Sequence, residues 1–437
     1  MRRTTPDPEG RARTSRSVLL PARREPDGAP RWLRRLGFAL SMVALVAALP
    51  VLARMGWKHA LAAGDEASAA SSADVAAPGY RAMVSPTPTM LLVHRSPAAE
   101  LAGVSMLAQV GDDSSAVLLI PTSLVVDAES GRGRTLASVF VAGGVDEVAA
   151  AVARALHIGF AQVVALDAAD WEAAAAGHTV VLENPDQLAD SDGQVRFEPG
   201  RLTLQAQDLE PYSRLRNAAE EDRGRLFRND LLWTAWFKSL AKGSPASTRD
   251  PFSVMVHAMA KASVVVVELP VVKADAMAAS QVEVGVSTNS LAQGVEDSLN
   301  REVFYVLDVD PAMALLSTIV PFPSAARPGD RIRVRLLNGI GDQTGALAAS
   351  AKLVPAGAEI TVFGNADRFD YANTMVEFFD ETQRNHAVTL AVALGVASPV
   401  FNPIADGTVD VSVIVGKDFS SPGAVRKTPL VGPPTSR

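Results

Sequence analysis

Five arginines gather in one short segment of this sequence. Arg214 and Arg216 stand two residues apart, so in an extended chain their side chains would project to the same side. Arg225 and Arg228 stand three residues apart at the start of a predicted helix, and therefore share one face of it. Guanidinium groups bind phosphate oxygens bidentately, and a helix N-terminus adds partial positive charge. The spacing predicts a site where these two pairs, with Arg223 nearby, converge on one anion.

Acidic residues interrupt the same segment and leave a second interpretation open. Glu220, Glu221 and Asp222 directly precede or begin the predicted helix. They could neutralise the arginines, in which case the cluster would be a solvated basic face without a ligand. Asp222 stands where an N-cap is expected, because a carboxylate there accepts hydrogen bonds from free backbone N–H groups. Spacing alone does not decide between the two interpretations.

Composition excludes several other kinds of site. The chain has no cysteine, which excludes disulfides and thiolate metal sites, and its six histidines show no paired metal spacing. It has neither a P-loop nor a G-x-S-x-G motif. In NGIGDQTG, residues 338–345, the glycines lie one residue off the dinucleotide-binding fingerprint, so a tight turn is the simpler interpretation. No metal site is expected.

The sequence around the arginines alternates between strand and helix patterns, and these elements would position the arginine side chains. The clearest helix covers residues 222–242, where large apolar side chains recur at three- and four-residue spacing before Gly243, a stop signal. The pattern predicts an α/β sandwich with a mostly buried sheet. Its strands are expected at 116–126, 160–167, 178–184 and 263–272, and further helices at 145–156 and 168–176.

A small C-terminal α/β domain is predicted after a proline-rich boundary at residues 320–329. The alternation of strand and helix patterns begins again there. The strands are expected at 331–339, 358–364, 373–379 and 408–416, and the helices at 342–353 and 381–394.

The N-terminal segment has the pattern of a membrane anchor. Residues 1–35 contain ten arginines and four acidic residues, and residues 36–53 are uncharged and apolar. That length is at the lower limit for a spanning helix, and the positive-inside rule places the N-terminus in the cytoplasm. The alternatives are a signal peptide cleaved near residues 60–64 and a buried core helix. The rest of the chain is acidic, so nucleic-acid binding is not expected.

The arginine segment also carries a family resemblance. LQAQDLEPYSRLRNAAEEDRGRLFRND, residues 204–230, resembles the block of LytR-CpsA-Psr (LCP) proteins that runs L-N-G-x-x-A-L-x-Y-x-R-x-R and then D-x-x-R-x-x-R-Q. Residues 156–175 resemble the strand–helix unit before that block, and residues 334–376 with 409–419 resemble the LytR C-terminal domain. The matching residues are Leu204, Leu209, Tyr212, Arg214, Arg216, Asp222, Arg225 and Arg228, while Asn229 stands in place of the glutamine.

This resemblance implies transfer of a glycopolymer from a polyprenyl-pyrophosphate carrier to a peptidoglycan hydroxyl. Arg214, Arg216, Arg225 and Arg228 would bind the pyrophosphate. Magnesium would offset its charge, a carboxylate would help to activate the hydroxyl, and an apolar groove would hold the lipid tail. Asp222 is the one residue with a possible catalytic role.

The first half of the core departs from the family pattern. In LIPTSL, residues 119–124, Thr122 and Ser123 replace an arginine and an aspartate, and LLVHR, residues 91–95, lacks an expected aspartate. A further expected aspartate falls near Gly103. Phosphoryl transfer depends on positioning and charge neutralisation, so these losses favour a degenerate core. Magnesium is expected only if the core is active.

The prediction is an LCP-like α-β-α sandwich with a mixed sheet, a C-terminal domain and an N-terminal transmembrane helix. A degenerate core would bind lipid-pyrophosphate-linked glycan, or a partner such as peptidoglycan or another LCP protein. An active ligase that recruits Asp112 and Asp113 for metal is the alternative, and a transcriptional regulator is disfavoured by the anchor. The expected parts are a basic tail (1–35), membrane helix (36–53), linker (54–85), LCP-like domain (86–320), LytR-type domain (330–420) and disordered tail (421–437).

The topology gives a first testable prediction. A reporter fused after residue 437 should be active only outside the cytoplasm, and the protein should remain in the membrane fraction, because the apolar run is expected to span the membrane uncleaved with its arginine-rich side in the cytoplasm. Cell fractionation with N-terminal sequencing measures both. A soluble product trimmed near residues 60–64 would instead support the signal peptide.

Overall fold

The structure is a computed structural model of the chain. It describes residues 74–111, 113–127, 133–190, 192–217, 220–242, 250–274, 282–283, 303–396, 398–403 and 408–419. The predicted membrane helix, the predicted C-terminal tail, Gly243 and Asp112 lie outside these ranges.

A five-stranded mixed sheet forms the centre of the core. Its strand order is β12-β4-β3-β2-β7. The outer pairs β12·β4 and β2·β7 are parallel, whereas β3 pairs antiparallel with both of its neighbours. The mixed sheet of the prediction is therefore confirmed. The strands are β2 (Thr89–Arg95), β3 (Leu101–Gln109), β4 (Ser114–Ile120), β7 (Gln162–Leu166) and β12 (Ser263–Glu268).

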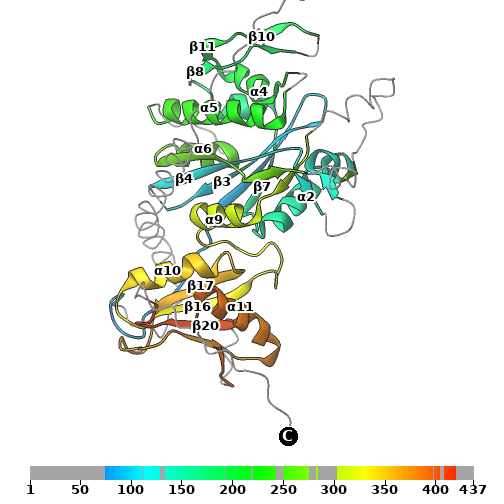
Figure 1. The fold of residues 1–437 in the computed structure, drawn as a ribbon. Coiled ribbons are helices and arrows are strands. Elements are labelled where there is room, and N and C mark those ends of the chain that lie inside the picture. The colour runs from blue at the N-terminus through cyan, green and yellow to red at the C-terminus, as the bar shows by residue number, and fades with distance from the viewer. Residues whose placement is uncertain are drawn as a thin grey trace, which may run out of the picture. The chain divides into compact units, whose positions relative to one another are not determined.

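Helices cover both faces of this sheet (Figure 1). Successive residues of a strand point to opposite faces, so Leu92 of β2 packs with one helix layer and Leu91 with the other. This arrangement confirms the predicted α-β-α sandwich. One layer contains α3 (Ala168–Ala174), α4 (Ala206–Arg214), α5 (Asp222–Leu240) and α6 (Pro251–Met259), and the other contains α2 (Leu136–Leu156) and α9 (Val309–Ile319).

Prolines divide two of the predicted strands. The strand expected at 116–126 becomes β4 and β5, and the one expected at 263–272 becomes β12 and β13. Pro121 and Pro270 stand at the two breaks, where a missing backbone N–H interrupts the ladder. The smaller strands are β5 (Val125–Val126), β6 (Gly133–Thr135), β8 (Val180–Asn184), β9 (Leu188–Ala189), β10 (Val195–Phe197), β11 (Gly200–Leu204), β13 (Val271–Lys273), β14 (Val282–Glu283) and β15 (Tyr305–Leu307).

An aromatic cluster fixes α5 against the sheet. The Trp171 ring of α3 lies 5.3 Å from the rings of both Trp233 and Trp236 of α5, and 6.1 Å from Phe252 of α6. Trp236 is fully buried. Such rings dominate the apolar area that a core buries. Because α5 carries two of the predicted anion ligands on its first turns, this cluster also sets where those ligands lie.

The helix α2 is also apolar enough to raise the question of membrane insertion. Among the described residues it alone has the length and composition of a membrane span, and half of that span is buried inside the protein. Leu136, Val139, Val148 and Val152 pack into the core beneath the sheet. We therefore interpret α2 as a core helix.

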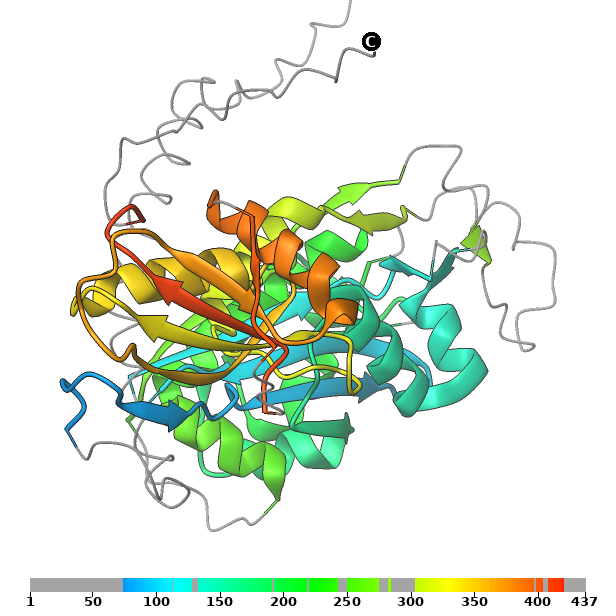
Figure 2. The ribbon, with the colours of Figure 1, turned by 90° about the horizontal axis from the view of Figure 1, so that it is seen from below.

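The C-terminal module has the predicted elements in the predicted order. Its sheet has the order β1-β17-β16-β20-β18-β19, and both helices contribute to one apolar cluster with it. In Figure 2 the yellow to red strands of the module run side by side. The chain enters the module between the end of α9 and β16, close to the predicted boundary at 320–329. Its elements are β16 (Ile332–Asn338), α10 (Gln343–Leu353), β17 (Ala358–Asn365), β18 (Met375–Phe378), the 3-10 turn η2 (Glu381–Gln383), α11 (Arg384–Leu394), β19 (Val400–Phe401) and β20 (Val411–Val415).

One strand of this module comes from before the core. β1 (Arg81–Met83) pairs antiparallel with the edge strand β17, although residues 54–85 were predicted to be a linker. The backbones approach closely here: Asn365 N donates to Tyr80 O at 2.8 Å. A Cβ atom at Gly364 would lie only 2.0 Å from the same carbonyl oxygen. Glycine is therefore required at position 364 for β1 to dock.

Gly364→Val should consequently weaken the docking of β1. A side chain at this position collides with backbone, so we expect a loss of about 1–3 kcal/mol in the free energy of unfolding, typical of overpacking. We also expect faster proteolysis of the segment before β2. Met83→Ala is the control, because Met83 lies on β1 but is half exposed. Wild-type stability and protease resistance in Gly364→Val would contradict the pairing.

Candidate functional site

Two helices that meet end to start present the predicted anion ligands. Arg214 is the last residue of α4, and Arg216 follows the C-cap residue Leu215. The expectation that Arg214 and Arg216 lie in extended chain and share a side is therefore wrong. The sequence signal that was missed is a capping box at Gln205, whose backbone N–H donates to Asp208 and starts a helix.

Asp222 does not cap α5, contrary to the prediction. Glu221 holds the N-cap position and Asp222 is the first helical residue. The Asp222 carboxylate turns toward Arg225, accepting from its Nη2 at 2.6 Å and from its Nε at 3.0 Å. The other carboxylate oxygen accepts from Thr122 Oγ1 at 3.1 Å and from both N and Oγ of Ser123 at 3.3 Å. The Asp222 carboxylate therefore binds Arg225 and the turn at Thr122 and Ser123, and not the free backbone N–H groups at the start of α5.

This ion pair is buried, because Asp222 is 2% and Arg225 is 5% exposed. Burial acts to raise the pKa of Asp222, but the charge and hydrogen bonds of Arg225, the backbone N–H of Ser123 and the charge of Arg216 outweigh it. The net effect is a lowered pKa, so Asp222 is ionised at neutral pH. A charged carboxylate thus occupies the guanidinium of Arg225.

The far end of Arg225 is also occupied. Its Nη1 donates to the backbone carbonyl of Ala102 on β3 at 2.8 Å. A Cβ atom at the neighbouring Gly103 would lie 3.2 Å from that nitrogen. The arginine therefore fills the space beside the position where the family resemblance expects an aspartate.

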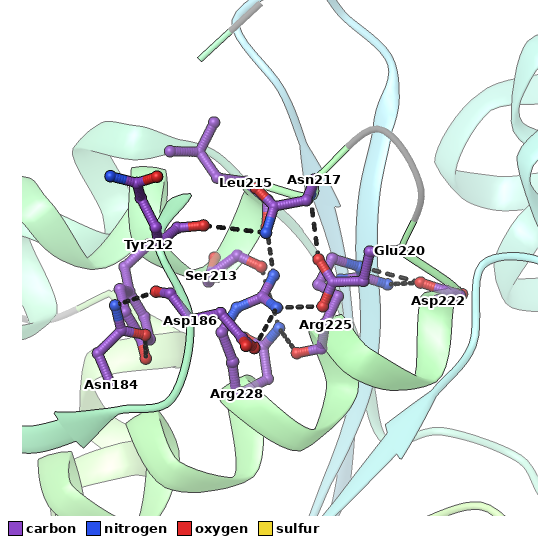
Figure 3. Close-up of polar contacts among 12 residues, drawn as sticks. Asn184, Asp186, Tyr212, Ser213, Leu215, Asn217, Glu220, Asp222, Arg225 and Arg228 are labelled. Atoms are coloured by element: carbon purple, nitrogen blue, oxygen red, sulfur yellow. Dashed lines mark hydrogen bonds and ion pairs between the residues drawn. The ribbon is translucent and has the colours of Figure 1, made fainter. Parts of the chain in front are cut away.

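Arg228 is the most deeply buried arginine of the cluster, at 1% exposure. It forms an ion pair with Glu220, and its Nη2 donates to the carbonyl of Leu215 at 2.8 Å (Figure 3). Asp186 approaches the same guanidinium at 3.8 Å. Arg228 thereby joins the end of α4 to the start of α5 and, like Arg225, is neutralised from within the chain.

The other arginines of the segment lie nearer to solvent. Arg223 is exposed and pairs with Glu268 at 3.2 Å. Arg214 donates through Nε to Glu210 at 2.8 Å, and its side chain is 30% exposed. Arg216 is exposed and makes no ion pair among the residues that the structure describes. The structure therefore separates a buried, neutralised pair from an outer pair, Arg214 and Arg216, that keeps free donors.

The solvated-face interpretation also fails for the buried pair. Arg225 and Arg228 do meet acids of their own segment, as that interpretation expected, but below the surface. Whether any of the four arginines binds a ligand stays a prediction.

Sequence reasoning missed His94 and Glu210. His94 Nε2 of β2 lies 3.2 Å from Glu210 Oε1, and both side chains are buried. His94 also lines a cavity of about 20 Å³ with Gly103, Ser213, Arg225 and other residues, which is room for roughly one water molecule. The signal available was a histidine inside the apolar run LLVHR.

The residues present do not fit a magnesium ion. Across the described part of the chain, no three His, Cys, Asp or Glu side chains are grouped so that they could share a metal. The oxygens of Asp222 already accept from Arg225, Thr122 and Ser123. Asp113, one of two acids considered as a replacement ligand, is exposed. No step that depends on a metal is derived from this site.

Comparison with solved structures gives distant similarities. TagV from B. subtilis is 14% identical with a TM-score of 0.39, and the match covers 54% of this chain and 98% of that one. TagT from B. subtilis is 17% identical with a TM-score of 0.40, covering 54% and 91%. A LytR-Csp2A-Psr enzyme from Actinomyces oris is 14% identical with a TM-score of 0.33, covering 50% and 92%. No match was found among curated protein sequences.

The C-terminal module gives the firmer identification. The sequence model of the family described as LytR cell envelope-related transcriptional attenuator matches residues 331–419. Those limits coincide with the elements from β16 to the turn after β20. The predicted resemblance to a LytR C-terminal domain is thus confirmed. Residues 331–419 of this chain form a LytR C-terminal domain, joined to a mixed α/β core.

Proposed function

We propose that this protein acts in cell-envelope glycopolymer attachment as an LCP-like protein that binds a phosphate-bearing, lipid-linked glycan without transferring it. The LytR C-terminal domain and the arginine block shared with LCP proteins support the process. The observation that carries the loss of transfer is the buried pair of Asp222 and Arg225.

Asp222 takes the place that an external anion would need at Arg225. Removing one member of a buried pair typically costs about 3–5 kcal/mol. A pyrophosphate would have to displace the carboxylate from Arg225 and also from the hydroxyls of Thr122 and Ser123. The acid would then lie buried beside an incoming anion. The core therefore holds Arg225 as a structural group.

The outer pair remains suited to a phosphate ligand. Arg214 uses only Nε toward Glu210, and no hydrogen bond from its terminal nitrogens is found in the described part of the chain. Arg216 is exposed, and its charge reaches Asp222. Leu215 lies between Arg214 and Arg216 in sequence, and its carbonyl accepts a hydrogen bond from Arg228. This bond fixes the turn from which both outer arginines project. We assign the ligand contact to Arg214 and Arg216.

Two finer points belong to the same proposal. The anchor at residues 36–53 holds the N-terminus in the cytoplasm and the core and C-terminal domain outside, where envelope polymers are attached. Peptidoglycan or another LCP protein is the second partner. An active phosphotransferase is the alternative, and a transferase assay separates the two.

The protein lacking residues 1–58 should bind a polyprenyl-pyrophosphate-linked glycan but transfer none of it to peptidoglycan. Radiolabelled glycan, acceptor and magnesium, with a transferring LCP protein as positive control, measure both steps. Magnesium should change the affinity little. Transfer above background, or binding that requires magnesium, would establish the active ligase instead.

Four arginine variants, Arg214→Ala, Arg216→Ala, Arg225→Ala and Arg223→Ala, separate binding from structure. Arg216→Ala should weaken binding by roughly tenfold or more at unchanged stability, because charge-assisted contacts contribute about 1.5–3 kcal/mol each. Arg225→Ala should instead lower the free energy of unfolding by about 3–5 kcal/mol, since it leaves Asp222 buried and unpaired.

Arg223→Ala is the matched control, because it removes an arginine that is 54% exposed and paired at the surface. It should change neither affinity nor stability appreciably. Calorimetric titration and chemical denaturation give the two quantities. Unchanged affinity in both Arg214→Ala and Arg216→Ala would remove the outer pair from the proposal.

A further inference from the structure

Glu210 connects the outer arginine pair to the centre of the sheet. Its Oε1 atom lies 2.8 Å from Arg214 Nε on its own helix and 3.2 Å from His94 Nε2 on β2. The Glu210 side chain is only 4% exposed, whereas that of Arg214 is 30% exposed. One buried carboxylate oxygen thus lies between an imidazole in the interior and a guanidinium near solvent.

The bond to Glu210 restrains the Arg214 side chain but does not use its two terminal nitrogens. A single bond through Nε restricts the rotation of the guanidinium and leaves the two terminal nitrogens, the fork that matches phosphate oxygens. Arg214 ends α4, and its bond to Glu210 is the side-chain hydrogen bond found for it in the described part of the chain. An ordered side chain binds at a lower entropic cost than a free one.

His94 lies against Glu210 on the other side, with Nε2 at 3.2 Å from Oε1 but without an aligned hydrogen bond. The imidazole is buried and lies 5.8 Å from the ring of Trp171 on α3. The charged groups that face it are Glu210 and Arg214 from α4 and Arg225 from α5. Burial, with the two arginines, lowers the pKa of His94 below its ordinary 6.5, although Glu210 acts to raise it. The ring is therefore neutral at pH 7.

We propose that His94 and Glu210 are positioning residues for the phosphate contact of Arg214, and that protonation of His94 alters that contact. This rests on the proposed ligand role of Arg214 and Arg216. An imidazolium lies beside the carboxylate oxygen that Arg214 also contacts, and it adds one positive charge behind the site. The conformation of Arg214 is therefore linked to the protonation state of a residue that never touches the ligand.

The direction with pH follows from that linkage. The lowered pKa means that the unfolded chain binds a proton at His94 more readily than the folded chain does, so stability falls as pH drops below 6.5. Within the folded protein, the added charge strengthens the attraction for phosphate in the same range.

The first test needs no ligand. In the full chain in detergent, labelled with ¹³C-histidine and ¹⁵N-arginine, the Arg214 Nε resonance should shift with the midpoint at which His94 titrates, below pH 6.5. His94→Gln and Arg214→Lys assign the two signals, and the arginine shift should vanish in His94→Gln. An Arg214 signal that stays flat down to the onset of acid unfolding would overturn the proposal.

The second test uses a short-chain prenyl pyrophosphate as the probe. Glu210→Gln should weaken binding about three- to tenfold at pH 7, the range that one hydrogen bond contributes. His94→Gln should weaken binding in the same direction, because it changes the surroundings of the Glu210 carboxylate. The wild-type affinity relative to His94→Gln should rise further as the pH falls, and this ratio cancels the titration of the probe itself.

The outcomes separate the two proposals. If Arg216→Ala weakens binding but Glu210→Gln and His94→Gln match the wild type at every pH, the ligand site stands and the positioning role is wrong. If none of the three variants affects binding, the ligand site fails, and the ligand-free titration still decides whether His94 acts on Arg214. If Glu210→Gln fails to fold, His94→Gln carries the comparison.

Discussion

A charge that leaves water needs an opposite charge or hydrogen bonds in its place, and this constraint organises the core. Arg225 and Arg228 lie below the surface, so each is matched by an acid of its own segment, Asp222 and Glu220. The Asp222 carboxylate also accepts a hydrogen bond from Ser123 in the turn after β4, which connects the start of α5 to the sheet. Arg225 and Arg228, which first suggest a ligand site, therefore stabilise the packing of α5 against α4 and the sheet.

Apolar packing and charge pairing support each other along α5. Its later turns bury Trp233 and Trp236 against Trp171, which fixes the helix axis, and its first turn can then hold Arg225 within reach of β3. The cavity left between these groups is only about 20 Å³, so the interior is filled by side chains. In this core, Arg225 and Arg228 therefore contribute to the packing of α5 against its neighbours through buried ion pairs.

The C-terminal module depends on the chain before the core as well as on the chain after it. Because β1 completes the β17 edge of its sheet, the core is inserted between the first strand of the module and the rest. An uncovered edge strand invites pairing with other chains, so β1 also protects the module. The segment that leads from the predicted anchor consequently enters the C-terminal module first, and the core second.

The sequence by itself determined the periodic elements: the helix from residue 222, the α/β class and the order of the main strands and helices from β16 to β20, but not β1 or β19. Those patterns depend on neighbours along the chain, which a sequence displays directly. The partners of the arginines were decided only by the tertiary structure. Thr122 meets Asp222 across 100 residues, and His94 of β2 lies beside Glu210 of α4. Such pairs exist because a sheet and a helix layer pack together, and local spacing carries no record of which distant groups that packing brings within bonding distance.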